Sequence, residues 1–202
     1  MSETFLSGDR YFENYKKYYA TGEFKLAKTN FLKAVDQFQR SDDICNLSAL
    51  YISKFLIEND NKSLDFAKRY ALMGYCQNEI NSIDFLVGGA FKYDQLPRSL
   101  KIQSTEFKSV DELLKQLKSK ELDDFSRSRL GRIFVQKLIE KKIAVDADKI
   151  INFTLDIDRF NGWTYFLKED LILKKRVCEL KKDECKYIDE RLDIIQMKLN
   201  KN

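Results

Sequence analysis

The chain has 202 residues, enough for one large domain or a short solenoid with a buried core. Its composition, 44% hydrophobic and 34% charged, excludes global disorder, and its single proline and seven glycines argue against an all-β fold, which needs many turns. The net charge of +4, from 36 basic and 32 acidic residues, is too small to predict nucleic-acid binding. The lack of histidine removes the commonest general base and the commonest metal ligand.

The sequence contains no apolar stretch of the roughly 18 residues that a transmembrane helix requires. Residues 1–10 lack the basic region and apolar stretch of a signal peptide. Two localisations stay open: the cytoplasm, if Met1 is the native start, and the periplasm or cell envelope, if a signal was removed and the cysteines are oxidised.

The first helical hairpin is predicted between Tyr11 and Phe38. Aromatic and apolar residues recur at spacings of three and four on both sides of Gly22, which is typical of two amphipathic helices joined by a tight turn. Gly22 suits that turn because helices often end in a left-handed residue. Ala27 and Ala34 lie on the packing face of the second helix, so the two helices are expected to approach closely.

This hairpin resembles the tetratricopeptide repeat, most clearly over residues 8–41. The chain departs from the repeat pattern at Tyr15, where a small residue is usual. The resemblance implies stacked antiparallel hairpins, and the alternative is an unrelated hairpin that needs the same small residues for packing. The six positions that match the repeat are Tyr18, Gly22, Phe24, Ala27, Phe31 and Ala34.

More helices are predicted to follow. Asp42 or Asp43 is expected to cap a helix that ends in a turn over 58–61, after which a helix with small residues completes a second, degenerate hairpin. The only proline, Pro97, lies among polar and basic residues, so 92–108 is predicted to be a linker. Further helices are predicted over 78–91, 110–118, 122–142, 146–160, 163–180 and 184–199.

The predicted fold class is all-α, with antiparallel helical hairpins stacked as a short tetratricopeptide-like solenoid or as a two-part helical bundle. The predicted domains are tetratricopeptide-like hairpins over 1–91 and C-terminal helical hairpins over 109–202, joined by the linker. The repeat consensus is hard to find in the second part.

The four cysteines are placed so that two disulfides can form. Cys45 opens the first helix of the second hairpin and Cys76 closes its last, and these ends are neighbours in an antiparallel pair. Cys178 and Cys185 flank a turn predicted at 181–183; in one continuous helix they would lie about 10.5 Å apart and could not bond. The alternative is four buried cysteines that act as small hydrophobic residues.

Pairing of cysteines across adjacent helices resembles that of secreted relatives of the tetratricopeptide class, although the likeness covers cysteine placement alone. Oxidised pairs imply an oxidising compartment. Because the chain has no C-x-x-C pair and no histidine, no metal site and no cofactor are predicted.

The tetratricopeptide resemblance also implies a partner-binding groove lined by the first helix of each hairpin. The mixture of side chains at these positions does not match the lysine- and asparagine-rich groove with which chaperone-binding members clamp a C-terminal carboxylate. The predicted groove residues are Asp9, Phe12, Lys16 and Tyr19 from the first hairpin and Asp43, Asn46, Leu50 and Ser53 from the second.

A basic cluster surrounds the last predicted turn. Acidic residues interleave with it, which favours a solvated, ion-paired face over a nucleic-acid site. The cluster comprises Lys174, Lys175, Arg176, Lys181, Lys182 and Lys186.

No phosphate-binding loop and no nucleophile with a histidine base are present, so the chain is not expected to be an enzyme. The predicted function is a protein–protein interaction or scaffold module that holds a peptide or protein segment in a groove. The alternatives are a structural cell-envelope protein or lipoprotein stapled by disulfides and, less favoured, a nucleic-acid-associated protein that uses the basic cluster. The partner and the oligomeric state are not specified by the sequence.

Overall fold

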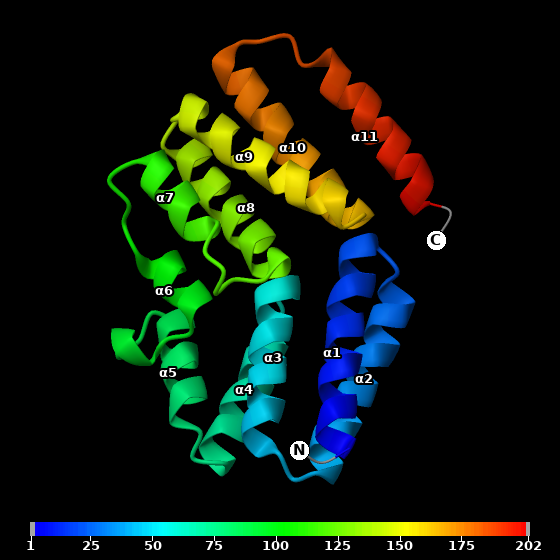
Figure 1. Ribbon diagram of the computed structural model, residues 1–202, viewed down its shortest axis with the longest axis vertical. Helices are drawn as coiled ribbons and strands as arrows, with labels where there is room; N and C mark the ends of the chain where they lie inside the picture. Colours follow the sequence, from blue (N-terminus) through cyan, green and yellow to red (C-terminus); the bar gives the residue numbers. More distant parts are fainter. Residues whose placement is uncertain (1–2, 201–202) are drawn as a thin grey trace. The chain divides into compact units, whose positions relative to one another are not determined.

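A computed structural model describes the backbone of residues 3–200 and the side chains of residues 7–200. Within that part of the chain every regular element is helical and no strand occurs (Figure 1). Successive helices pack against each other, which confirms the predicted all-α class of helical hairpins. The elements are α1 (Glu3–Thr21), α2 (Phe24–Arg40), α3 (Ile44–Glu58), α4 (Asn61–Met73), α5 (Gln77–Leu86), the 3₁₀ helix η1 (Tyr93–Gln95), α6 (Arg98–Ser104), α7 (Val110–Leu117), α8 (Asp124–Glu140), α9 (Ala144–Phe160), α10 (Thr164–Lys181) and α11 (Lys186–Leu199).

The chain divides into two compact units. Unit 1 consists of residues 1–16 and 25–101, and unit 2 consists of residues 17–24 and 102–202. The segment 92–108, which the sequence predicted to be a linker, contains η1 and α6 and buries Leu96 and Leu100. Pro97 begins α6 instead of interrupting a helix, because its carbonyl accepts a hydrogen bond from the Lys101 amide at 3.0 Å and proline needs no donor at a helix start.

One turn geometry recurs between the helices. A residue in the left-handed region ends one helix, and the next amide donates to the carbonyl five residues back, the pattern of a Schellman motif. Gly22 has a φ of +87° and lies at the bend between α1 and α2, as predicted. The same arrangement occurs at Asp42, Tyr75, Gly88, Lys142, Gly162 and Lys182, of which four are not glycine.

Unit 1 is held together by a chain of aromatic rings that crosses its helices. Tyr15 of α1 packs edge-on against Phe31 of α2 at 5.3 Å between centroids, and Phe31 packs against Tyr51 of α3 at 5.3 Å. Tyr51 in turn stacks on Tyr70 of α4 at 5.7 Å. Because each ring contacts the next helix, neighbouring hairpins share one continuous contact.

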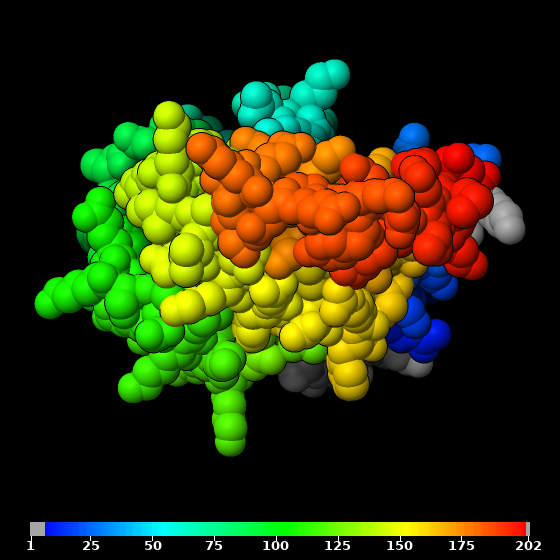
Figure 2. Space-filling view, turned by 90° about the horizontal axis from the view of Figure 1, so that it is seen from above, coloured from blue at the N-terminus to red at the C-terminus, as the bar shows by residue number. Residues whose placement is uncertain are grey.

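Unit 2 contains α8, α9 and α10 as an antiparallel row, with α11 against α10. In Figure 2, α9 (yellow), α10 (orange) and α11 (red) form adjacent bands of one face of this unit. Gly131 of α8 and Thr154 of α9 set the close approach of the first two helices, since a Cβ at Gly131 would lie 2.5 Å from the Thr154 hydroxyl oxygen.

Candidate functional site

The first candidate site is the face of unit 1 formed by α1 and α3. Tyr15 donates a hydrogen bond from its hydroxyl to Glu58, near the end of α3, at 2.9 Å. Near the other end, burial raises the pKa of Asp9, with added repulsion from Glu13 and then from Asp43, the residue that precedes α3. The beginnings of α1 and α3 therefore lie near each other, and the two helices run in the same direction.

Phe12 and Lys16 form one contact on α1. They are one helical turn apart and partly exposed, with the Lys16 Nζ 5.2 Å from the centre of the Phe12 ring. Lys16 also forms an ion pair with Glu13 at 2.6 Å. The Lys16 side chain is only 13% exposed, so its ammonium group lies between the Phe12 ring and the exposed Glu13 carboxylate.

On α3, the predicted groove residues have mixed roles. Asp43 caps the helix: its carboxylate accepts from the backbone amide of Asn46 at 3.2 Å and from the Asn46 side-chain amide at 2.8 Å. Ser53 lies two turns beyond Asn46 and is partly exposed. Asp43 thus has a structural role that is sufficient to explain its presence.

Two of the predicted groove residues lie elsewhere. Leu50 is only 2% exposed, so its side chain belongs to the core; it continues the apolar spacing of Leu47, a signal that favoured burial. Tyr19 falls in unit 2, where its ring packs against Phe24 at 5.2 Å and Tyr165 at 5.7 Å. The residues that remain available on the α1–α3 face of unit 1 are Asp9, Phe12, Lys16, Asp43, Asn46 and Ser53.

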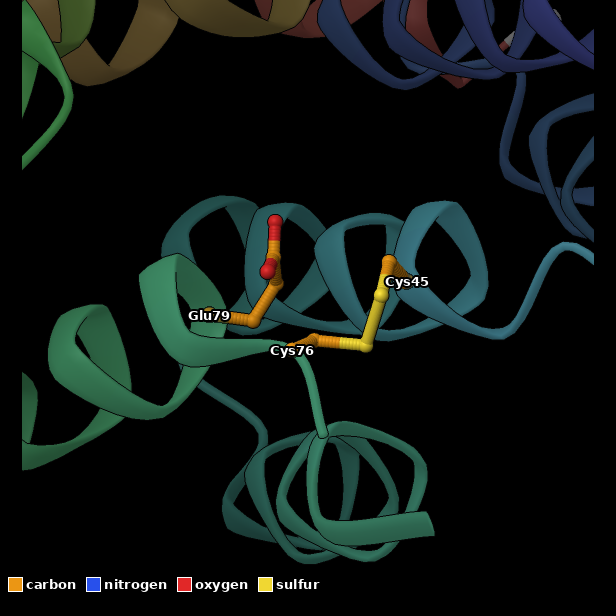
Figure 3. A group of neighbouring side chains, drawn as sticks. All are labelled: Cys45, Cys76 and Glu79. Carbon is orange, nitrogen blue, oxygen red and sulfur yellow. A yellow bond between two sulfur atoms is a disulfide. The ribbon is translucent and has the colours of Figure 1, made fainter. Parts of the chain in front are cut away.

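The second candidate site surrounds the cysteine pair of unit 1. Cys45 and Cys76 form a disulfide with 5.5 Å between their Cα atoms, the pairing that their placement predicted (Figure 3). The ligand atoms of Cys45, Cys76 and Glu79 all lie within 4.8 Å of one another. Glu79 was not predicted from the sequence, because neither a histidine nor a C-x-x-C pattern marks it. The available signal was its position three residues after Cys76, about one helical turn away.

The second cysteine pair lies in unit 2. Cys178 and Cys185 form a disulfide with 6.0 Å between their Cα atoms, and the turn between α10 and α11 separates them, as the sequence predicted. All four cysteines of the chain are paired in the structure. Within the described residues, no third metal-ligating side chain joins this second pair.

The third candidate site is a charged cluster in unit 2, in which two buried carboxyl groups contact one largely buried arginine. Arg132 of α8 donates from one guanidinium nitrogen to Asp158 of α9 at 2.8 Å and to Asp170 of α10 at 3.2 Å. Both carboxylates are 0% exposed. Ser128 accepts from the same nitrogen at 2.8 Å, and the guanidinium carbon lies 4.0 Å from the centre of the Phe166 ring. One cation therefore joins three helices.

Two ionised carboxylates beside one cation would bury a net negative charge, so one of the two carboxyl groups is expected to keep its proton. One oxygen of Asp158 and one of Asp170 are buried without a hydrogen-bond partner when both groups are ionised. Burial raises the pKa of Asp170 to about 8, opposed by Arg132 and reinforced by Asp158; burial also raises the pKa of Asp158. A proton on Asp170 that is donated to Asp158 supplies the partner that both oxygens lack and leaves one ion pair with Arg132.

Three residues of the predicted basic cluster form ion pairs with acidic residues. Lys174 contacts Asp148 at 2.6 Å, Lys175 contacts Asp189 at 2.7 Å, and Lys181 contacts Asp183 at 2.9 Å. Half of the six cations are therefore engaged by carboxylates, mostly from other helices or turns.

Comparisons with protein-family models, with curated proteins and with solved structures return no match to this chain. Among the described residues, no helix is long and apolar enough to cross a membrane.

Proposed function

We propose that the chain is a non-enzymatic interaction module of tetratricopeptide-like type that holds a peptide or protein segment on the α1–α3 face of unit 1. The observation that carries this proposal is the parallel arrangement of α1 and α3 in consecutive hairpins, with partly exposed aromatic, cationic and amide side chains along both. Aromatic rings and polar groups on a rigid support are the usual makings of a protein contact surface.

The distribution of charge on this face suggests the orientation of the bound segment. Asp9 and Asp43 make one end of this face acidic, whereas Lys16, paired with Glu13, lies about two helical turns beyond Asp9 on α1. An extended segment with a basic residue at one end and an apolar or acidic residue at the other complements that order.

The test is capture of partners from the native host with the tagged chain. Phe12→Ala/Lys16→Ala removes the central contact and is expected to abolish retention of the specific partner. Leu32→Ala/Lys28→Ala is the matched control, because it removes an exposed apolar residue and a lysine at the same spacing from α2. Equal recovery of the same proteins by both variants would contradict the proposal.

A second function is favoured by the two disulfides: a structural protein of an oxidising compartment, such as a cell-envelope component. Chain purified from its native host under denaturing, non-reducing conditions is then expected to present no free thiol. Four reactive thiols per chain would contradict this placement and leave the interaction proposal intact.

A further inference from the structure

A disulfide requires only two cysteines, but the cluster of Cys45, Cys76 and Glu79 also contains a carboxylate. Its three ligand atoms come from the beginning of α3, from the residue before α5, and from the first turn of α5. No lysine or arginine within residues 7–200 forms an ion pair with Glu79. A carboxylate without a cationic partner therefore lies beside two sulfur atoms, as Figure 3 shows.

The space beside the Cys76 sulfur is limited and requires glycine at position 74. A Cβ at Gly74 would lie 2.6 Å from the Cys76 sulfur and 2.9 Å from Ile44, so a side chain at this position would occupy the space beside the sulfur. The Gly74 carbonyl is 3.9 Å from the Cys45 sulfur, within reach of a thiol proton. A reduced Cys45 therefore has a backbone carbonyl that can accept its thiol proton.

We propose that the reduced form of this cluster binds a thiophilic divalent cation of the zinc class through Cys45, Cys76 and Glu79, and that the disulfide closes the site. Two thiolates and a carboxylate are ligands that Zn²⁺ accepts, and three protein ligands leave a fourth position for water. Ligand atoms about 2.3 Å from a tetrahedral metal lie roughly 3.7 Å from one another, so the separations within 4.8 Å need only a small contraction once the sulfurs part.

The oxidised and reduced states interconvert by thiol–disulfide exchange. A dithiol reductant transfers two electrons and two protons to the disulfide, the bond between the Cys45 and Cys76 sulfurs breaks, and the reductant becomes a disulfide. The cation then displaces the two thiol protons into solvent, so binding weakens as pH falls. Disulfide formation and metal binding use the same sulfurs and exclude each other.

The chain contains its own control. The Cys178–Cys185 pair also forms a disulfide but has no third ligand within the same distance among the described residues. A cation bound there would be held by two thiolates alone. The proposal therefore assigns the strong site to unit 1.

The experiment uses the full chain, reduced with a phosphine under anaerobic conditions and titrated with Zn²⁺ against a competing chromophoric chelator. We expect one tight zinc ion per chain, at least tenfold weaker binding by Glu79→Gln, and none at that affinity by Cys45→Ser/Cys76→Ser. Cys178→Ser/Cys185→Ser is expected to bind like the unsubstituted chain, and the oxidised chain is expected to bind none.

Co²⁺ provides a second readout, because thiolate ligation gives charge-transfer absorption that disappears on oxidation. Absent zinc binding, equal affinity of the Glu79→Gln variant, or binding that survives loss of Cys45 and Cys76 would each overturn the proposal. Loss of the helical circular dichroism signal on reduction would also overturn it, because the site needs α3 and α5 to stay packed.

Discussion

Units 1 and 2 consist of the same kind of helices and helix-ending turns, but different contacts hold their helices together. Unit 1 relies on contacts between aromatic rings and on a disulfide that joins residues 31 apart. Unit 2 relies on a largely buried cation shared by three helices, and its disulfide joins residues only 7 apart. One backbone plan therefore tolerates two kinds of core: among the described residues, the buried polar side chains of unit 1 are all uncharged, whereas unit 2 also buries two carboxyl groups.

The cluster of Arg132, Asp158 and Asp170 is expected to make the largest single contribution to the stability of unit 2 against unfolding. Arg132→Met removes the cation and leaves two buried carboxyl groups, so unfolding free energy is expected to fall by about 3–5 kcal/mol. Trp163 is the only tryptophan, lies in unit 2 and packs against Phe166, so its fluorescence during urea unfolding reports this unit alone. Arg127→Met, which removes a partly exposed pair with Asp124, is the control and is expected to cost far less.

The two disulfides are expected to differ in strength. Loop-closure entropy predicts that loss of Cys45–Cys76 costs about 3.7 kcal/mol and loss of Cys178–Cys185 about 2.4 kcal/mol, for sequence separations of 31 and 7. Urea unfolding of the two double serine variants measures these losses. Loss of the Cys45–Cys76 disulfide is expected to shift the circular dichroism transition but not the Trp163 fluorescence transition. Loss of the Cys178–Cys185 disulfide is expected to shift the Trp163 fluorescence transition. The opposite assignment would contradict the comparison of the units.

The close packing of α8 against α9 leaves no space for a side chain at position 131, so substitution of Gly131 is expected to destabilise unit 2. Gly131→Ala places a Cβ against the Thr154 hydroxyl, and the loss of stability is expected to be about 1–3 kcal/mol by urea unfolding. In a Thr154→Ala background the same substitution is expected to be neutral or stabilising, because alanine favours a helix over glycine. Equal losses in both backgrounds would show that this contact does not set the helix spacing.

The pH dependence of unit 2 follows from Asp170. Its pKa of about 8 in the folded chain exceeds the unfolded value of 3.8, so between these values the folded chain keeps a proton that the unfolded chain has lost. The contribution of this proton to the free energy of unfolding is fully present below pH 4 and is lost as the pH rises to 8. Over that range the free energy of unfolding falls by at most about 1.4 kcal/mol per pH unit. Urea unfolding of Asp170→Asn, followed by Trp163 fluorescence, is expected to flatten that slope, and Asp189→Asn is expected to leave it unchanged.

The smallest expected effect concerns the turns. Lys142 has a φ of +59°, which strains a residue with a Cβ, so Lys142→Gly is expected to gain about 0.5–1 kcal/mol in thermal unfolding. Gly162 has the same role one helix later, with a φ of +67° and open space around it, so Gly162→Ala is expected to lose about 1 kcal/mol. Effects of equal sign at both positions would contradict the equivalence of these turns.

Much of the fold was predictable because local signals specify it. Apolar spacing and caps placed most helices within a few residues, although α6 lies in the predicted linker and α5 ends at Leu86 instead of 91. Gly22 and the cysteines marked the turns and the contacts between helix ends. The left-handed residues Tyr75 and Lys142 carry no such signal, because neither residue type favours that conformation; the Schellman hydrogen bonds of the helix ends stabilise it there.

The sites were less predictable, because they depend on which helices meet. Asp158 and Asp170 occupy positions in apolar stripes, which indicates burial, but nothing in the sequence relates them to Arg132 on another helix. Leu50 was misplaced because the repeat resemblance outweighed its apolar spacing, and Tyr19 because the division between the units falls within α1.

The central claim is that the α1–α3 face of unit 1 contacts another protein. The most direct measurement places a photo-crosslinking phenylalanine analogue at Phe12 or at Leu32 in the full chain and irradiates cells of the native host. A discrete crosslinked adduct from position 12, with none from position 32, is the predicted result. Adducts from position 32 alone, or from neither position, would contradict the claim.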